Sequence, residues 1–190
     1  MTTSTHAHDS SQRFIFENAD IRGELVRLNK TYIDTVHGKN YPEVVARLLG
    51  EFLAASVLLS TTIKFDGRLV LQVRSKGEVA LMMAECTSNG EVRGIARYDV
   101  VPTSSEFTEL LRDGTLVITI DTRKGEPYQG VVALEGNSLA ECLHDLGIEA
   151  SCFAGDLSDP AHATSLVETA LARLGHVDIL INNAGTTWGA

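Results

Sequence analysis

The sequence predicts an α+β fold for most of the chain, followed by a strand–helix–strand unit of a different kind. Residues 14–146 contain strand patterns joined mainly by hairpin turns, with helices interspersed, rather than strict alternation of strand and helix. Residues 148–185 read as a strand, a helix and a second strand, the order of a parallel crossover. Composition also changes at this junction, because residues 146–190 contain one basic residue, Arg173, against five acidic ones.

Composition and charge narrow the class of protein. The chain has 190 residues, of which 44% are hydrophobic and 22% charged, as is ordinary for a soluble globular protein. Its net charge of −9 argues against nucleic acid and anionic membranes as partners, because both are bound through clustered Lys and Arg. No secretory signal is recognisable, and the most apolar segment, Phe52–Leu59, is too short to cross a bilayer. We therefore expect no membrane partner and a cytoplasmic location.

The N-terminal elements end in a long apolar helix. Residues 1–12 are rich in Ser, Thr and His without a period, which predicts a disordered tail. Residues 14–28 read as an extended segment interrupted at Gly23, and residues 32–37 as a weak helix. Pro42 then marks a helix start, and apolar residues follow through Leu59 at i, i+3, i+4 spacing. This stripe has two interpretations, a core helix or a groove that faces a client.

Strand patterns occupy the chain from Lys64 onward. Three turn signals separate them: Asp66-Gly67, Lys76-Gly77 and Asn89-Gly90. The apolar strands are expected over residues 69–73, 79–84 and 92–100. Thr103 and Glu106 read as the cap of a short helix that ends near Asp113-Gly114.

The next stretch predicts a hairpin and a capped helix. Strands at residues 116–120 and 128–134 flank a polar turn at residues 122–126. Ser138 with Glu141 forms a capping box, so a helix should open at Leu139 and stop at Gly147. Residues 136–140 also faintly resemble a nucleophile elbow, but the last glycine of that motif is absent, so the capping role of Ser138 is favoured.

Several of these segments together resemble one family. The stretches FENADIRGELVRL, LLGEFLAASVLLSTTIKFDGRLVLQV, GEVRGIARYD and GTLVITI…GEPYQGVVALEGNSLAECL are similar to the N-terminal domain of the heat-shock protein 33 family of redox-regulated chaperonins. The resemblance implies that residues 13–146 form a truncated domain of antiparallel sheets with packed helices. It also implies an ATP-independent holdase that binds unfolded client polypeptides. The net charge of −9 favours a soluble homodimer or small oligomer over precipitation.

Residues 147–190 resemble a different family. Asp-Leu-Ser-Asp after the strand at 148–155 and Asn-Asn-Ala-Gly after the strand at 177–181 are similar to a central piece of the short-chain dehydrogenase/reductase family. In that family, residues matching Asp156 and Leu157 lie by the adenine, and those matching Asn183–Gly185 line the cofactor cleft. We expect a Rossmann-type fragment, so the chain looks like a fusion of two truncated parents. Its strands are the candidates to complete the sheet of the N-terminal domain.

The other parts of such an oxidoreductase are not found in the sequence. The partial glycine motif Gly90–Ala96 lies at a hairpin signal and continues as a strand, whereas a pyrophosphate-binding turn opens a helix. No Tyr-x-x-x-Lys pair occurs, and no lysine follows Lys124. We therefore expect no catalytic residue, no enzyme activity and no NAD(P) cofactor. The alternative interpretation is an inactive fragment of an NAD(P)-dependent oxidoreductase.

Metal sites are not expected either. His6 and His8 form an H-x-H pair on the predicted tail, where two ligands make a poor site. The chain has three cysteines, Cys86, Cys142 and Cys152, and none of them forms a C-x-C or C-x-x-C pair. The heat-shock family holds the zinc of its redox switch with such pairs. We therefore expect Cys86 and Cys142 to be packing residues, and client protection to be independent of redox state.

Overall fold

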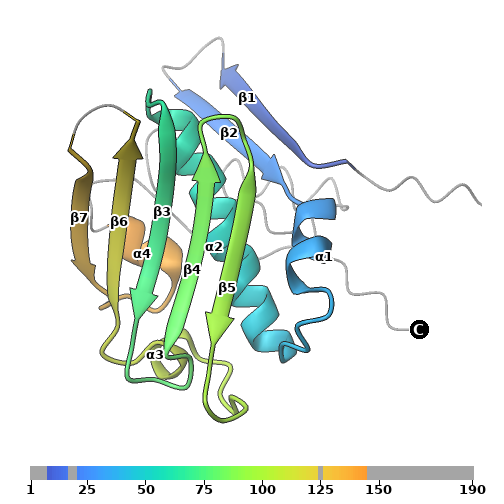
Figure 1. Cartoon of the computed structure of the whole chain (residues 1–190), viewed down its shortest axis with the longest axis vertical. Helices are drawn as coiled ribbons and strands as arrows, with labels where there is room; N and C mark the ends of the chain where they lie inside the picture. Colours follow the sequence, from blue (N-terminus) through green and yellow to red (C-terminus); the bar gives the residue numbers. More distant parts are fainter. Residues whose placement is uncertain (1–7, 17–20, 124–125, 145–190) are drawn as a thin grey trace, which may run out of the picture.

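The computed structural model describes residues 8–16, 21–123 and 126–144. Within these ranges the fold is α+β, as predicted. A five-stranded antiparallel sheet packs on helices, and a separate two-stranded hairpin lies beside it (Figure 1). The described part therefore has the antiparallel sheets and packed helices that the sequence indicates.

The first two strands form a hairpin. Strand β1 (Ser10–Phe16) pairs antiparallel with β2 (Ile21–Arg27), from Ser10 opposite Arg27 to Phe16 opposite Ile21. The expected disordered tail is wrong for residues 10–12, because β2 supplies backbone partners for them. Gly23 does not interrupt the extended segment but lies within β2, where a Cβ atom would be 2.3 Å from the ring of Phe14. The missing side chain leaves room for that ring.

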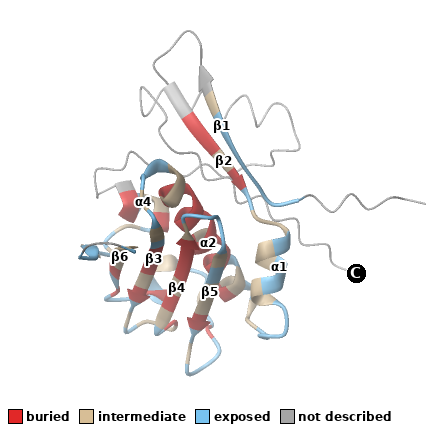
Figure 2. Ribbon diagram, turned by 45° about the horizontal axis from the view of Figure 1, so that its top comes forward, coloured by how far each residue is buried: buried red, intermediate tan, exposed pale blue. Residues whose placement is uncertain are grey.

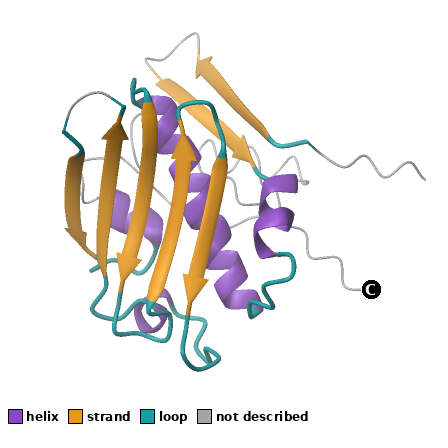
Figure 3. Cartoon of the chain, in the orientation of Figure 1, coloured by secondary structure: helices purple, strands orange, loops and turns teal. Residues whose placement is uncertain are grey.

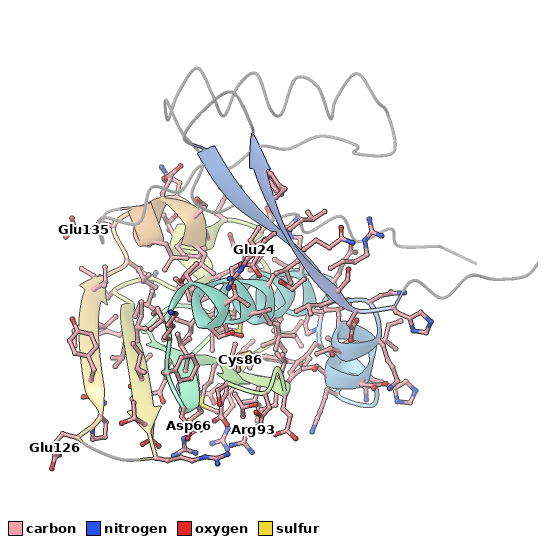
Figure 4. All side chains as sticks on the ribbon, turned by 90° about the horizontal axis from the view of Figure 1, so that it is seen from above. Glu24, Asp66, Cys86, Arg93, Glu126 and Glu135 are labelled. Atoms are coloured by element: carbon pink, nitrogen blue, oxygen red, sulfur yellow. The ribbon has the colours of Figure 1, made fainter. Side chains whose placement is uncertain are left out.

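A buried carboxylate ties this hairpin to the long helix. Glu24 of β2 is 4% exposed, and it accepts hydrogen bonds from Ser11, from Arg13 at 3.3 Å and from Thr61 at 2.6 Å. Figure 4 shows Glu24 between the hairpin and α2. A carboxylate is costly to bury without partners, so these donors fix the hairpin on the end of the helix.

Two helices follow the hairpin. Helix α1 (Lys30–Val36) matches the predicted weak helix, and α2 (Glu43–Thr62) begins directly after Pro42. Helix α2 has 20 residues and, by length and composition alone, could cross a membrane. The segment Phe52–Leu59, which is the most apolar in the sequence, covers only part of this helix. However, 67% of its most apolar window is buried inside the fold. The core-helix interpretation of the apolar stripe is therefore confirmed.

The sheet has the strand order β5-β4-β3-β6-β7, with every neighbouring pair antiparallel. Its strands are β3 (Gly67–Arg74), β4 (Leu81–Thr87), β5 (Val92–Arg97), β6 (Thr115–Thr122) and β7 (Tyr128–Ala133). The central pair β3–β6 joins segments far apart in the sequence. The meanders β3-β4-β5 and β6-β7 are therefore held together side by side as one layer.

Two of the three predicted turn signals connect neighbouring strands. Asn89-Gly90 joins β4 to β5, and Gly90 adopts a φ of 82°, which glycine tolerates best. Asp66-Gly67 is different, because it leads from α2 into β3 and does not make a hairpin. A Cβ atom at Gly67 would lie 2.0 Å from the carbonyl oxygen of Asp121, so close strand approach accounts for this glycine.

The predicted cap of the short helix is wrong. Helix α3 comprises only Phe107–Leu110, and Thr103 does not cap it. The hydroxyl and N–H groups of Thr103 instead donate to the carboxylate of Glu78 at 2.9 and 2.8 Å, and the Ser104 N–H donates to it at 3.0 Å. These bonds lower the pKa of Glu78, because they favour its charged form. The Thr103 side chain therefore bonds to a carboxylate distant in the sequence and not to the start of α3.

The cap of α4 (Leu139–His144) is confirmed. The N–H of Glu141 donates to Ser138 Oγ at 3.1 Å, and the carboxylate of Glu141 accepts from the Asn137 N–H at 2.7 Å. The second bond reaches one residue further back than in a standard capping box. Ser138 therefore starts the helix, as the capping interpretation requires.

The core lies between α2 and one face of the sheet. Figure 2 shows buried positions concentrated on α2 and on the strands in front of it. Phe52, Leu53 and Leu49 of α2 are fully buried, and Gly94 of β5 lets the last two approach, since a Cβ atom there would lie 2.9 Å from Leu53. The expectation that residues 148–154 and 177–181 complete the sheet lies outside the described residues and stays a prediction.

Replacing Phe52 with Ala tests the core role of α2. The side chain is 0% exposed, so we expect the free energy of unfolding to fall by about 3–5 kcal/mol, the usual cost of emptying such a site. Urea unfolding followed by circular dichroism measures this loss. Val100→Ala is the control, because Val100 is 77% exposed and its truncation should change stability by no more than about 0.5 kcal/mol. An equally small effect at Phe52 would contradict the core assignment.

Candidate functional site

The face of the five-stranded sheet that points away from α2 is the candidate site. Figure 3 shows the helices behind the sheet, and no helix or strand of the described chain lies in front of it. Antiparallel sheets commonly keep one face solvated, and that face is then usually polar. Here it carries apolar residues, so it differs from an ordinary solvated face.

Strand alternation identifies the residues of this face, because the neighbours of buried core positions point the other way. On β3, Leu69, Leu71 and Val73 are fully buried against the helix side, so the residues between them lie on the opposite side. Besides Ala133, following the register across all strands gives six larger apolar residues there, which we call the outer face: Val70, Leu81, Met83, Ile95, Val117 and Val131.

The outer face is continuous across the sheet. Ile95, Met83, Gln72, Val117 and Val131 stand opposite one another in a single row from β5 to β7. With neighbouring strands about 4.8 Å apart, this row spans roughly 19 Å. Its members are half-buried, except Val131 on the edge strand, which is 67% exposed. Apart from Gln72, its one polar member, the row is apolar and forms a shallow band open to solvent on the described structure.

An ion-pair network occupies one end of the outer face. Glu85 of β4 is 6% exposed, and its carboxylate lies 3.0 Å from Arg93 and 4.0 Å from Arg68. Arg68 also contacts Asp121 of β6 at 2.7 Å. Figure 4 shows Arg93 on the side of the sheet away from α2. The network links β3, β4, β5 and β6, and both of its carboxylates already have cationic partners.

The alternative interpretation of the apolar stripe, an exposed groove on α2, is wrong. Twelve residues of the helix are buried, and β2, β3, β4 and β5 all contact it. The stripe fills the interior because the sheet presents Leu69, Leu71 and Val73 to it. Apolar surface that is available for binding lies on the opposite side of the sheet.

Cys86 and Cys142 are fully buried, which confirms that they are packing residues. Cys86 lies between β4 and α2 (Figure 4), with its Sγ 3.2 Å from Ser60 Oγ. Burial raises the pKa of the Cys86 thiol, the Ser60 hydrogen bond lowers it, and the charge of Glu85 raises it further. The net effect is a raised pKa, so the reactive thiolate form is disfavoured. Cys152 lies outside the described residues.

The partial glycine motif Gly90–Ala96 has no cofactor-binding geometry. Gly90 is in the β4–β5 turn, and Gly94 is in the middle of β5 facing α2. No helix opens there, so backbone N–H groups do not converge as they do on a pyrophosphate. The other sequence features of the short-chain dehydrogenase type, Asp156, Leu157 and Asn183–Gly185, lie outside the described residues, as does His6.

From the sequence alone, no residue of the outer face was predicted to belong to a binding site. A signal existed, since Val70, Met83, Ile95 and Val117 are apolar residues in the strand phase opposite to the core. Apolar residues in both phases indicate a strand with two buried faces, as in a sheet covered on each side. That pattern does not reveal that, in the described chain, only one side of the sheet is covered by helices.

Comparison with known proteins gives two family matches. The family model described as Hsp33 protein matches residues 9–146, and the model for short chain dehydrogenase matches residues 107–190. The matches overlap at residues 107–146. In the structure, this overlap contributes α3, β6, β7 and α4 to the antiparallel sheet and its helices, down to His144.

Curated relatives and one solved structure agree with the first match. The chain is 53% identical over 137 residues to the 33 kDa chaperonins of Pseudomonas paraeruginosa and Azotobacter vinelandii, and 51% identical to that of Pseudomonas syringae pv. tomato. Each alignment covers 71% of this chain and 46% of the relative, so the chain spans about half of their length. The crystal structure of the 33 kDa chaperonin from Thermotoga maritima matches with a TM-score of 0.63 at 18% identity, covering 75% of this chain and 52% of that one.

Thiol labelling tests the burial of the two described cysteines. In a Cys152→Ser variant, we expect Cys86 and Cys142 to react with an aromatic disulfide reagent at least about tenfold more slowly in the folded chain than in urea, because burial blocks access to both thiols and also disfavours the thiolate of Cys86. Absorbance of the released thiol measures both rates. The urea-unfolded chain is the control for intrinsic reactivity. Equal rates in the two states would contradict this assignment.

Proposed function

Because this chain belongs to the Hsp33 protein family, we propose that it is an ATP-independent chaperone module that holds unfolded polypeptides. The observation that carries the proposal is the outer face, an apolar band without a cover in the described structure. Contiguous exposed apolar surface of this kind is typical of sites that bind other polypeptides. The names of the relatives, which are chaperonins, support the same activity.

The physical basis of holding is the removal of apolar surface from water. An unfolded client exposes side chains that a folded protein buries, and the outer face can cover some of them. Burying apolar area contributes about 25 cal/mol per Å², part of which the ordering of the client opposes. We therefore propose weak, reversible and sequence-tolerant binding, which needs no nucleotide to release the client.

We also propose that this activity does not depend on redox state. The sequence contains no C-x-C or C-x-x-C pair, and two of its three cysteines are buried between packed elements. A switch made of buried thiols would require local unfolding before any oxidant could reach them. We further propose, as the sequence led us to expect, that the protein is cytoplasmic and forms a homodimer.

An oxidoreductase is the second candidate, because residues 107–190 match the short chain dehydrogenase model. Against it, β6 and β7 are antiparallel neighbours joined by a short connection, whereas a dinucleotide fold needs parallel strands joined by helices. We therefore propose that the chain is not an enzyme and needs no NAD(P).

Titration calorimetry separates the two candidates. We expect no measurable heat of binding for NADH or NADPH, since residues 8–16, 21–123 and 126–144 provide no glycine-rich turn that opens a helix. An intact short-chain dehydrogenase is the positive control under the same conditions. A dissociation constant in the micromolar range would contradict the proposal and favour the oxidoreductase.

Light scattering of a thermally unfolding client tests the chaperone proposal. We expect the chain to suppress aggregation equally with a reductant and with peroxide. Replacing Met83 and Ile95 of the outer face by Thr should raise the concentration needed for half protection about tenfold, because two apolar contacts are lost in strand positions that tolerate Thr.

The matched control removes the same kind of surface elsewhere. Val100 and Val101 are 77% and 62% exposed in the loop after β5, so the double Thr variant there should protect like the unmodified chain. Equal loss in both variants would mean that the outer face is not the binding surface. Protection only after oxidation would overturn redox independence, and no protection by the unmodified chain would overturn the proposed function.

A further inference from the structure

We propose that the outer face prefers client segments in which two acidic residues flank an apolar residue, at positions i, i+2 and i+4 of an extended chain. This inference rests on the proposed function and names the class of client segment. It comes from the arginines that border the apolar band. The outer side of the sheet carries four arginines but only two carboxylates, on a chain whose net charge is −9.

Two of the four arginines are already neutralised. Arg93 pairs with Glu85 at 3.0 Å, and Arg68 pairs with Asp121 at 2.7 Å and approaches Glu85 at 4.0 Å. These pairs account for both carboxylates on this side of the sheet. Any remaining cation there has no acidic neighbour on its own face.

Arg74 and Arg97 are those remaining cations. Both stand directly opposite Leu81, Arg74 from β3 and Arg97 from β5, so the three residues form one row with the leucine in the middle. Both arginines are exposed, and neither guanidinium makes an ion pair or a hydrogen bond with a described residue. A carboxylate of the client could therefore pair with either guanidinium without displacing an existing partner.

The spacing of this row suits an extended client that crosses the strands. Neighbouring strands are about 4.8 Å apart, so the Cα atoms of Arg74 and Arg97 are roughly 10 Å apart. Alternate residues of an extended client recur about every 6.6 Å on one side, so three of them span about 13 Å. The middle residue can rest on Leu81 while the outer two reach the guanidiniums, whose long side chains absorb the difference. Arginine also pairs with carboxylates through two parallel N–H···O hydrogen bonds, which favours acidic side chains over neutral ones.

Fluorescence anisotropy with labelled synthetic peptides tests this preference on the whole chain. Three short peptides share a repeated Leu flanked at i−2 and i+2 by Glu, by Gln or by Lys, with Ser between. We expect the Glu peptide to bind about fivefold more tightly than the Gln peptide, and the Lys peptide most weakly. The advantage of Glu over Gln should shrink in 1 M salt, where the screening length falls to about 3 Å.

Variants assign the preference to the two arginines. In Arg74→Gln/Arg97→Gln, the Glu peptide should lose its advantage, while the Gln peptide binds as before. The matched control is Arg27→Gln/Arg47→Gln, which removes the same charge from exposed residues of β2 and α2, the part of the fold on the other side of the sheet. It should keep the full preference. Thermal unfolding of each variant checks that it is folded. The peptide series on the unmodified chain tests the acidic preference even if a variant fails to fold.

The outcomes separate this inference from the proposed function. Equal affinity for the three peptides, or an equal effect of the two double variants, would overturn the acidic preference and leave the chaperone proposal standing. Failure to bind any peptide, together with failure to suppress aggregation, would overturn both.

Discussion

The packing of α2 against one side of the five-stranded sheet is the constraint on which the rest of the described structure depends. Leu49, Phe52 and Leu53 of the helix fill the space above β3, β4 and β5, and Gly94 permits the close approach of Leu49 and Leu53. Because a sheet has only two sides, committing the helix to one of them leaves the other without a helical cover. The same contact holds the hairpin β1–β2, since Glu24 bonds to Thr61 at the end of α2.

This arrangement explains why an uncovered apolar band is compatible with a stable domain. Stability comes from the helix side, where the core side chains are fully buried, and does not require the outer face to be covered. The ion pairs of Glu85 and Asp121 with Arg93 and Arg68 fix the alignment of four strands on the exposed side. These ion pairs hold the sheet in register without any layer of the described chain over the band.

The sequence predicted the elements better than their environment. Strand patterns and turn residues located β3 to β7, and the Ser138–Glu141 pair located α4, because these signals are local. The misassigned positions were decided by distant partners. Residues 10–12 became a strand through β2, and Thr103 bonded to Glu78, 25 residues earlier. The outer face was missed for the same reason, since apolar residues such as Val70 and Met83 look alike in sequence whether or not another layer covers them.

The overlap of the two family matches at residues 107–146 has a structural resolution. A local pattern of strand, strand and helix occurs in this range, and such a pattern alone does not distinguish an antiparallel sheet from a dinucleotide fold. Pairing distinguishes them. β6 lies between β3 and β7 and runs antiparallel to both, and Leu116 joins the core beneath α2 with Leu71 and Val73. A strand held on both sides in this way cannot also be a member of a parallel sheet. Up to His144, the described chain therefore follows the Hsp33 arrangement, and any contribution of the short-chain type begins beyond the residues that complete this sheet.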